Sequence, residues 1–165
     1  MKTLLQQYAA YHFWANQQLS IRILELDDSF AHKPLPSSFP SLHKTLLHMW
    51  SAETIWWKRL QKDLPARADT APFETDTPAL VKDLLELNEQ WIDWLKDLPE
   101  TAFEQQFSYT NLKGIAFEQP LYQVIHHLFN HGTYHRGQLV TMLRALEIDN
   151  IPQTDFVHWA RGTNK

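Results

Sequence analysis

The chain has 165 residues, of which 44% are hydrophobic and only 4 are glycine, so it is long enough to bury a core and too apolar to be disordered. Its formal net charge is −4 and it contains no block of lysine or arginine, which argues against nucleic acid as the main partner. No apolar run approaches the roughly 18 residues that a membrane span needs, and the lack of cysteine excludes disulfides and a protein thiol nucleophile. Because the N-terminus turns polar too early for a signal peptide, we expect a cytoplasmic protein with no membrane partner.

Apolar side chains recur at helical spacing in four segments. The first helix is expected over residues 2–27, and a proline-rich loop follows at 31–41. Ser41 or Ser38 can cap a second helix that runs to about residue 62. The third helix is expected over residues 78–97, with the hydroxyl of Thr77 as its cap and Pro78 at its first position.

The pattern changes between residues 99 and 120, where β-favouring side chains flank a turn-like Asn-Leu-Lys-Gly segment at 111–114, which predicts a short β-hairpin. Pro120 then opens the fourth and longest helix, to about Glu147, and a short helix is expected from Asp155. The chain is therefore predicted to be all-α, a four-helix bundle with a short β-hairpin excursion before the last long helix. We expect residues 1–165 to form a single domain of this kind.

Two histidines interrupt the apolar stripe of the fourth helix. His131 and His135 are four residues apart and therefore lie one turn apart on the same face. A buried imidazole is costly unless its nitrogens are satisfied, and a shared metal ion would satisfy both rings. The third ligand must come from another helix, and His48, at the edge of the second helix's apolar stripe, is the best placed. Three neutral imidazoles leave a position for water or substrate, as in catalytic zinc sites, and zinc, nickel, iron or another divalent ion would fit.

Plainer interpretations of the same pattern remain open. A pair of histidines four apart also arises by chance, and a histidine-rich helix can present some rings to solvent. His127, one turn before His131, can be a ligand, a group that orients a ligand, or a packing residue. The other histidines expected at the surface or at an interface are His12, His32, His43 and His158.

Rival catalytic motifs are absent: the chain contains neither HExxH nor a glutamate followed three residues later by histidine, which excludes the common metalloprotease and di-iron signatures. Gly132 and Gly137 flank His135, although each glycine inside a helix costs about 1 kcal/mol relative to alanine. They are expected to allow close helix approach or room for a ligand. Trp56 and Trp57 differ by about 100° around their helix, so one should meet another element or another subunit.

Several segments together resemble the DinB-like family, also known as the DinB/YfiT-like metalloenzymes, over nearly the whole chain. The most specific is the HxxxHRGQ pattern. The matching pieces are NHGTYHRGQ at residues 130–138, WAN at 14–16, the segment from Ser41 through His48 to Trp56, and Pro152 with Asp155-Phe156. The resemblance implies a four-helix bundle, commonly dimeric, that holds a divalent metal through His48, His131 and His135.

Related proteins with assigned chemistry transfer or isomerise substrates with low-molecular-weight thiols such as bacillithiol or mycothiol. The resulting hypothesis is a homodimeric, metal-dependent thiol S-transferase or hydrolase that acts on a small molecule. Its catalytic residues beyond the metal ligands are unknown, His127 and Tyr134 are candidates for orienting the ligands, and Arg136 is expected in an ion pair or at the dimer interface. The alternatives are a non-catalytic, stress-related protein that binds a metal or a ligand, and a helical interaction module without a metal.

Overall fold

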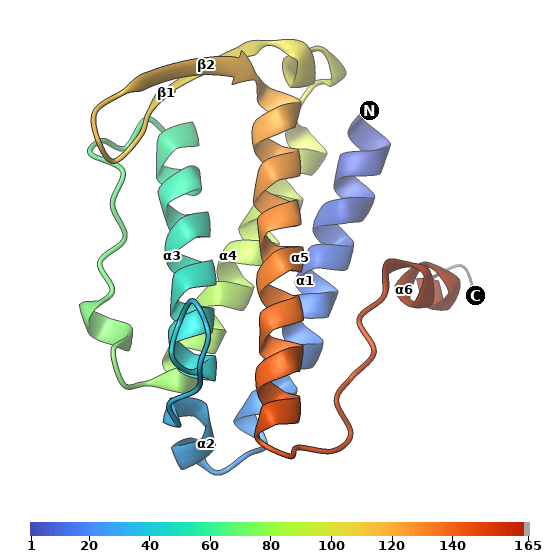
Figure 1. Ribbon diagram of the computed structural model, residues 1–165. Helices are drawn as coiled ribbons and strands as arrows, with labels where there is room; N and C mark the ends of the chain where they lie inside the picture. Colours follow the sequence, from blue (N-terminus) through green and yellow to red (C-terminus); the bar gives the residue numbers. More distant parts are fainter. Residues whose placement is uncertain (164–165) are drawn as a thin grey trace.

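Four long helices lie side by side in the computed structural model, which describes residues 1–163 (Figure 1). They are α1 (Lys2–Leu24), α3 (Leu42–Leu60), α4 (Thr77–Asp97) and α5 (Leu121–Ala145). Both α1 and α3 pack against α4 and against α5. The predicted all-α bundle is therefore confirmed. Within residues 1–163, no helix combines the length and the apolar character needed to cross a bilayer.

The four long helices do not simply alternate in direction along the chain. In Figure 1, α1 descends, α3 and α4 both ascend, and α5 descends again. The segment at residues 61–76 contains the 3₁₀ helix η1 (Ala71–Phe73) and runs back along the length of the bundle. This long connection lets α4 start at the same end of the bundle as α3 and run parallel to it (Figure 1). As a result α3 and α5 are antiparallel neighbours, and residues from the middle of each helix can meet.

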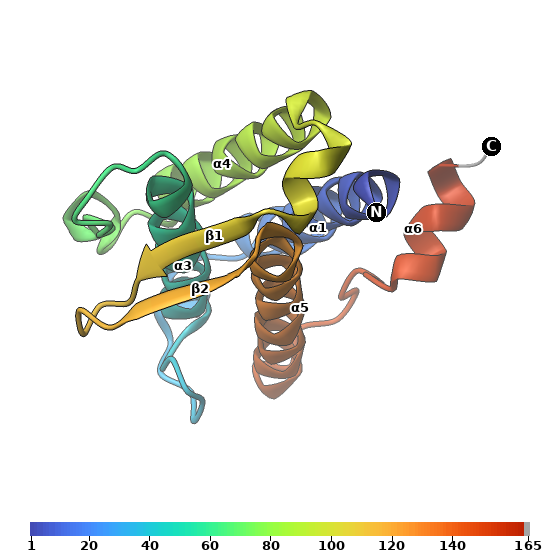
Figure 2. The same ribbon diagram turned by 90° about the horizontal axis from the view of Figure 1, so that it is seen from above.

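The predicted hairpin is also present. After the 3₁₀ helix η2 (Glu100–Glu104), strand β1 (Gln106–Thr110) pairs antiparallel with β2 (Ala116–Pro120). The turn between them is closed by the side chain of Asn111, which accepts hydrogen bonds from the backbone N–H of Lys113 at 2.9 Å and of Ile115 at 3.0 Å. Gly114 has a φ of +80°, which glycine adopts without strain. The hairpin lies across the ends of α3 and α5 (Figure 2).

The first helix is shorter than predicted. α1 ends at Leu24 instead of residue 27, and a second short helix, α2 (Asp28–His32), follows after the expected end of the first helix and runs into the start of the expected loop. The reason is local, because the side chain of Asp27 accepts a hydrogen bond from the backbone N–H of Ser29 at 3.0 Å and so caps a new helix. Near the other terminus, α6 (Phe156–Thr163) begins one residue after the predicted start.

The two predicted helix caps had different outcomes. For α3, Ser41 is the cap and not Ser38, since its hydroxyl accepts a hydrogen bond from the N–H of Lys44 at 3.1 Å. For α4, the prediction of Thr77 was wrong. Asp76 caps the helix by accepting from the N–H of Ala79 at 2.9 Å. Thr77 lies inside the first turn, and its hydroxyl is engaged by the Nδ1 atom of His43 at 3.0 Å.

The adjacent tryptophans separate as predicted. The ring of Trp57 packs edge-on against that of the buried Trp91 of α4, with 5.0 Å between ring centroids. The ring of Trp56 instead meets Tyr109 of β1 at 4.8 Å. Trp57 therefore joins the core, whereas Trp56 attaches the hairpin to α3.

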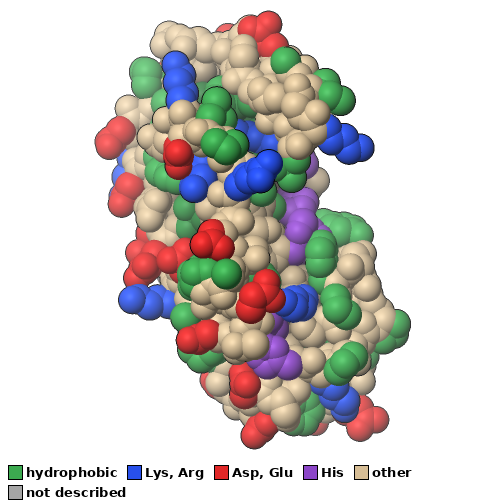
Figure 3. All heavy atoms as spheres, turned by 90° about the vertical axis from the view of Figure 1, so that its left-hand side faces the viewer, with side chains coloured by type: hydrophobic (Ala, Val, Ile, Leu, Met, Phe, Trp, Pro, Cys, Tyr) green, Lys and Arg blue, Asp and Glu red, His purple; other side chains and the backbone are tan. Residues whose placement is uncertain are grey.

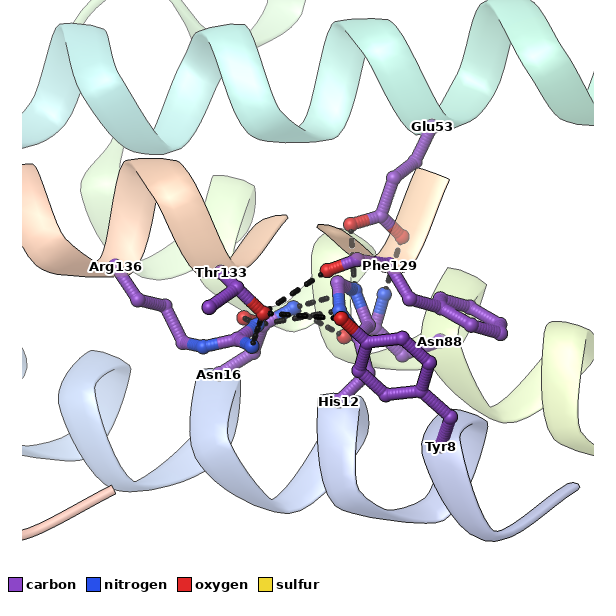
Figure 4. A network of polar contacts seen from close by, with 8 residues as sticks. All are labelled: Tyr8, His12, Asn16, Glu53, Asn88, Phe129, Thr133 and Arg136. Carbon is purple, nitrogen blue, oxygen red and sulfur yellow. Dashed lines mark hydrogen bonds and ion pairs between the residues drawn. The ribbon is translucent and has the colours of Figure 1, made fainter. Parts of the chain in front are cut away.

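A buried polar network joins all four long helices at the centre of the bundle (Figure 4). Glu53 of α3 accepts a hydrogen bond from the side chain of Asn88 of α4, and its other oxygen lies 2.9 Å from Nε2 of His12 of α1. Arg136 of α5 donates to Nδ1 of His12 at 3.1 Å and to Oδ1 of Asn16 at 2.9 Å. All five side chains are at most 2% exposed.

The partners of His12 determine its protonation. A guanidinium only donates and a carboxylate only accepts, so His12 accepts from Arg136 through Nδ1 and donates to Glu53 through Nε2. This ring is neutral, and burial lowers the pKa of His12 in agreement, against the opposing effect of Glu53.

The structure corrects the surface or interface prediction for two histidines. His12 is 1% exposed and His43 is 0% exposed. His12 lies in the network, and Nδ1 of His43 contacts the hydroxyl of Thr77, both partners far along the chain that helical periodicity cannot reveal. His32 is half-buried and His158 is exposed. Arg136 was expected in an ion pair or at a dimer interface; it is buried within one protein molecule, and its described partners in the network are His12 and Asn16.

Gly132 is the residue that lets α5 approach α1. A Cβ atom at this position would lie 2.3 Å from Cε1 of His12, whose ring is held in place by the network. At Gly137 a Cβ atom would meet nothing within 4 Å. Close helix approach therefore explains the first glycine and not the second.

We expect Gly132→Ala to lower the free energy of unfolding by about 1–3 kcal/mol, because the added methyl group overpacks a fixed ring. Gly137→Ala is the matched control and should raise it by up to about 1 kcal/mol through helix propensity. Urea unfolding followed by circular dichroism measures both values. Equal stabilisation by the two substitutions would contradict the close approach at residue 132.

Candidate metal centre

Three histidines converge between α3 and α5. His48 extends from α3, and His131 and His135 extend from successive turns of α5. The Nε2 atom of His131 lies 3.2 Å from Nε2 of His48 and 2.9 Å from Nε2 of His135. One nitrogen from each ring lies within 4.8 Å of the other two. The structure thus brings together the three residues predicted as ligands, and we call them the histidine triad.

The geometry of the histidine triad fits a divalent metal ion. An ion bound tetrahedrally at about 2.0–2.1 Å from each imidazole nitrogen places those nitrogens roughly 3.3 Å apart. The two Nε2 separations of 3.2 and 2.9 Å are close to that value. Three Nε2 atoms that face one another need a proton or a cation between them. No aspartate, glutamate or cysteine joins this group among residues 1–163, so the donor set is purely imidazole.

Gln138 orients one of the three rings. Its Oε1 atom lies 2.7 Å from Nδ1 of His135, and its amide nitrogen donates to the hydroxyls of Tyr134 at 3.2 Å and Ser38 at 3.3 Å. With its oxygen toward His135, Gln138 accepts a hydrogen bond from Nδ1–H of that ring. The Nε2 atom of His135, which faces Nε2 of His131, then carries the lone pair, and this is the arrangement that a metal ligand needs.

Sequence reasoning missed Gln138, although its position was informative. It lies three residues after His135, on a neighbouring part of the same helix face. Tyr134 touches the ring of His135 edge-on, with 5.0 Å between centroids, and acts on it through Gln138. His127 is exposed and makes no hydrogen bond to the histidine triad, and its ring lies 5.9 Å from that of His131.

Phe39 covers one side of the histidine triad, which the sequence did not indicate. Its ring stacks on His48 with 4.0 Å between centroids and an angle of 19°, and it meets His135 edge-on at 5.7 Å. Phe39 belongs to the proline-rich loop at residues 33–41, which Ser38 also attaches to Gln138. The same loop therefore shields the ligands and supports the residue that orients one of them.

Burial keeps the three rings neutral. Together with a smaller contribution from the neighbouring imidazoles, burial lowers the pKa of His48 and of His131 to about 4. Burial also lowers the pKa of His135, and the hydrogen bond with Gln138 opposes this effect. Neutral imidazole is the form that binds a metal, so at neutral pH few protons compete for these nitrogens.

The histidine triad is partly accessible from solvent. His135 is 3% exposed, whereas His48 and His131 are of intermediate exposure. On the face shown in Figure 3, histidine side chains reach the surface in two places, among hydrophobic and charged side chains. The intermediate exposure of His48 and His131 allows a small molecule to approach these ligands without unfolding of the bundle.

The sequence profile of the DinB family matches residues 1–162. The chain belongs to the DinB family. It is 29% identical to Protein DinB of Bacillus subtilis strain 168, in an alignment that covers 88% of this chain and 87% of that protein.

Solved structures show that the fold is shared at lower identity. A DinB-like protein from Bacillus cereus has a TM-score of 0.71 and 15% identity, over 90% of this DinB-family chain and 94% of that protein. YjoA of Bacillus subtilis, also DinB-like, has a TM-score of 0.66 and 16% identity over 92% and 98% of the two chains. YfiT of Bacillus subtilis has a TM-score of 0.66 and 14% identity over 90% and 91%, and is described as a probable metal-dependent hydrolase with an unusual four-helix bundle topology.

We expect the metal affinity to depend weakly on pH near neutrality. Three free imidazoles with a pKa of about 6.5 would lose about 30-fold in affinity between pH 7 and pH 6, because each loses two thirds of its neutral form. The lowered pKa values of His48, His131 and His135 move this competition to more acidic solution, so the loss should stay below about threefold. Competition titrations with a chromogenic zinc chelator at both pH values measure it. A 30-fold loss would show that the rings titrate as free histidines.

Gln138→Leu should weaken zinc binding about 10- to 100-fold, since Nδ1 of His135 loses the acceptor that orients its ring. Gln123→Leu, the same change at an exposed position of α5, is the matched control and should leave the affinity unchanged. The same chelator competition at pH 7 reports both. Equal affinity in the two variants would remove Gln138 from the site.

Proposed function

We propose that this DinB-family chain is a divalent-metal-dependent enzyme that acts on a small molecule, with His48, His131 and His135 as the metal ligands. The observation that carries the proposal is the convergence of their three Nε2 atoms between α3 and α5. A divalent ion in such a site acts as a Lewis acid and lowers the pKa of a water or a thiol that binds beside the ligands. The description of YfiT as a probable metal-dependent hydrolase supports the same class of chemistry.

The chain's own residues perform three tasks in this proposal. The neutral rings of the histidine triad supply three nitrogen donors and leave further positions for the nucleophile and the substrate. Gln138 holds His135 in the tautomer that binds. Phe39 covers the stacked face of His48, so solvent is excluded from that side and substrate approaches from another.

The nucleophile is water in a hydrolase and a small thiol in an S-transferase. Because the chain has no cysteine, any thiol must come from a low-molecular-weight cofactor. Zinc, nickel and iron all accept imidazole ligands, so the metal present in the purified protein decides which ion is used. The homodimer and the cytoplasmic location stay predictions.

Metal analysis of the protein purified without a histidine tag tests the site. We expect about one divalent ion per chain, and loss of stoichiometric metal in His48→Ala, His131→Ala and His135→Ala, since each removes one of three ligands. His126→Ala, an exposed histidine of the same helix, is the matched control and should retain the ion. Full occupancy in both single variants of α5 would refute the proposed ligands.

Turnover tests the reaction class. The metal-loaded protein is incubated with a panel of electrophiles and esters, with and without bacillithiol, mycothiol or another cellular thiol. Product that forms only with a thiol identifies an S-transferase, and product that forms without one identifies a hydrolase; either activity should disappear in His48→Ala. Full metal occupancy with no product in any combination would instead support a metal-binding protein without catalysis.

A further inference from the structure

A row of rings leads from the histidine triad toward the hairpin. The ring of His131 lies 5.9 Å from that of His127, which lies 5.7 Å from Trp56 of α3. The ring of Trp56 in turn lies 4.8 Å from that of Tyr109 in β1. Each of these side chains keeps some exposure to solvent. We call these four residues the ring row, and it extends from His131 of α5 to Trp56 of α3 and on to the hairpin.

Arg59 lies at the far end of the ring row. Its guanidinium carbon is 4.4 Å from the ring centroid of Trp56 and 5.2 Å from that of Tyr109. Its Nε atom is buried, and no described residue accepts a hydrogen bond from it. No carboxylate among residues 1–163 forms an ion pair with Arg59, whereas Arg22 pairs with Glu25 at 3.1 Å. Within residues 1–163, the contacts seen for the charge of this half-buried cation are with the rings of Trp56 and Tyr109.

This environment favours an oxyanion. Partial removal of a guanidinium from water is costly when no anion compensates it, and cation–π contacts return only part of that cost. The two rings also hold the planar group in one orientation, so its N–H fork is preorganised. A carboxylate or a phosphate matches that fork with two parallel hydrogen bonds.

The neighbouring cavity offers a weaker alternative. A cavity of about 390 Å³ beside His48 is lined by Phe39 and Lys44, among others. The ammonium group of Lys44 already forms an ion pair with Glu74, so its charge is neutralised. Of Lys44 and Arg59, both on α3, Arg59 is therefore the one left for an anionic ligand.

We propose that Arg59 binds the carboxylate or phosphate of a small anionic molecule that lies along His127 and Trp56 and brings its reactive end to the histidine triad. This molecule is the substrate of the proposed enzyme, so the assignment rests on the proposed function and names its substrate class. His48 and Arg59 are separated along α3 by roughly 16 Å at 1.5 Å per residue, so the molecule must be extended. Its middle section should be flat or apolar to pack on the ring row.

Nuclear magnetic resonance titrations of the full chain test the anion site with benzoate, phenyl phosphate and the neutral isostere benzamide. We expect both anions to shift the Arg59 Nε–H and Trp56 indole N–H signals, and benzamide to bind at least tenfold more weakly. Whichever of benzoate and phenyl phosphate binds more tightly shows whether the site prefers a carboxylate or a phosphate. The titrations are repeated after a chelator has removed any metal. Anion-induced shifts of the Arg59 signal that persist without metal show that the anion site is independent of the histidine triad, so the two proposals can fail separately.

Three variants complete the test. Arg59→Met should weaken both anions at least tenfold without changing zinc affinity, and Arg59→Lys should recover part of the loss, since it keeps the charge but lacks the planar fork. Arg144→Met, an exposed arginine on α5, is the matched control and should bind as the wild type does. If circular dichroism shows that Arg59→Met does not fold, the comparison of benzoate with benzamide and the Arg59→Lys variant test the anion site instead. Benzamide binding as tightly as benzoate, or shifts confined to residues around Lys44, would overturn the proposal.

Discussion

The arrangement of this bundle depends on the buried bridge from Arg136 through His12 to Glu53, because that bridge sets the rotation of α5 about its own axis. His131 and Gly132 are adjacent, and so are His135 and Arg136, so within each pair the side directions differ by about 100°. Gly132 and Arg136 face α1. The preceding residues, His131 and His135, therefore face α3. The network that fills the centre of the bundle thereby directs two imidazoles at His48, without touching any of the three rings.

The two polar clusters of the bundle differ in how their hydrogen-bonding groups are satisfied. In the central network, donors of Arg136 and Asn88 meet acceptors on His12, Asn16 and Glu53, so the main charges are compensated inside the protein, although Nε of Arg136 has no acceptor within residues 1–163. In the histidine triad, acceptor nitrogens face one another, and nothing within the described chain compensates them. A satisfied network stabilises a fold, whereas converging lone pairs are favourable only with a cation between them. This contrast separates a structural cluster from a candidate site in the same helices.

Segments outside the four long helices give the site its two sides. The loop at residues 33–41 places Phe39 over His48 and holds Gln138 through Ser38, which couples the position of the loop to the orientation of a ligand. The hairpin attaches to α3 through Trp56 and places Tyr109 beside Arg59. Phe39 therefore covers the triad at His48 and His135, whereas His131 begins the ring row that ends beside Arg59.

The sequence by itself determined the features that depend on neighbours along the chain. Helical periodicity located the four long helices, and turn residues located the hairpin. Spacing placed His131 and His135 on one face, with His48 as the most suitable third ligand. Only the tertiary structure decided what depends on distant partners. It placed His12 and His43 in the interior, engaged the hydroxyl of Thr77 with His43, and brought Phe39 against His48. The physical reason is range: backbone geometry repeats every 3.6 residues, whereas the satisfaction of a buried polar group depends on side chains from other helices.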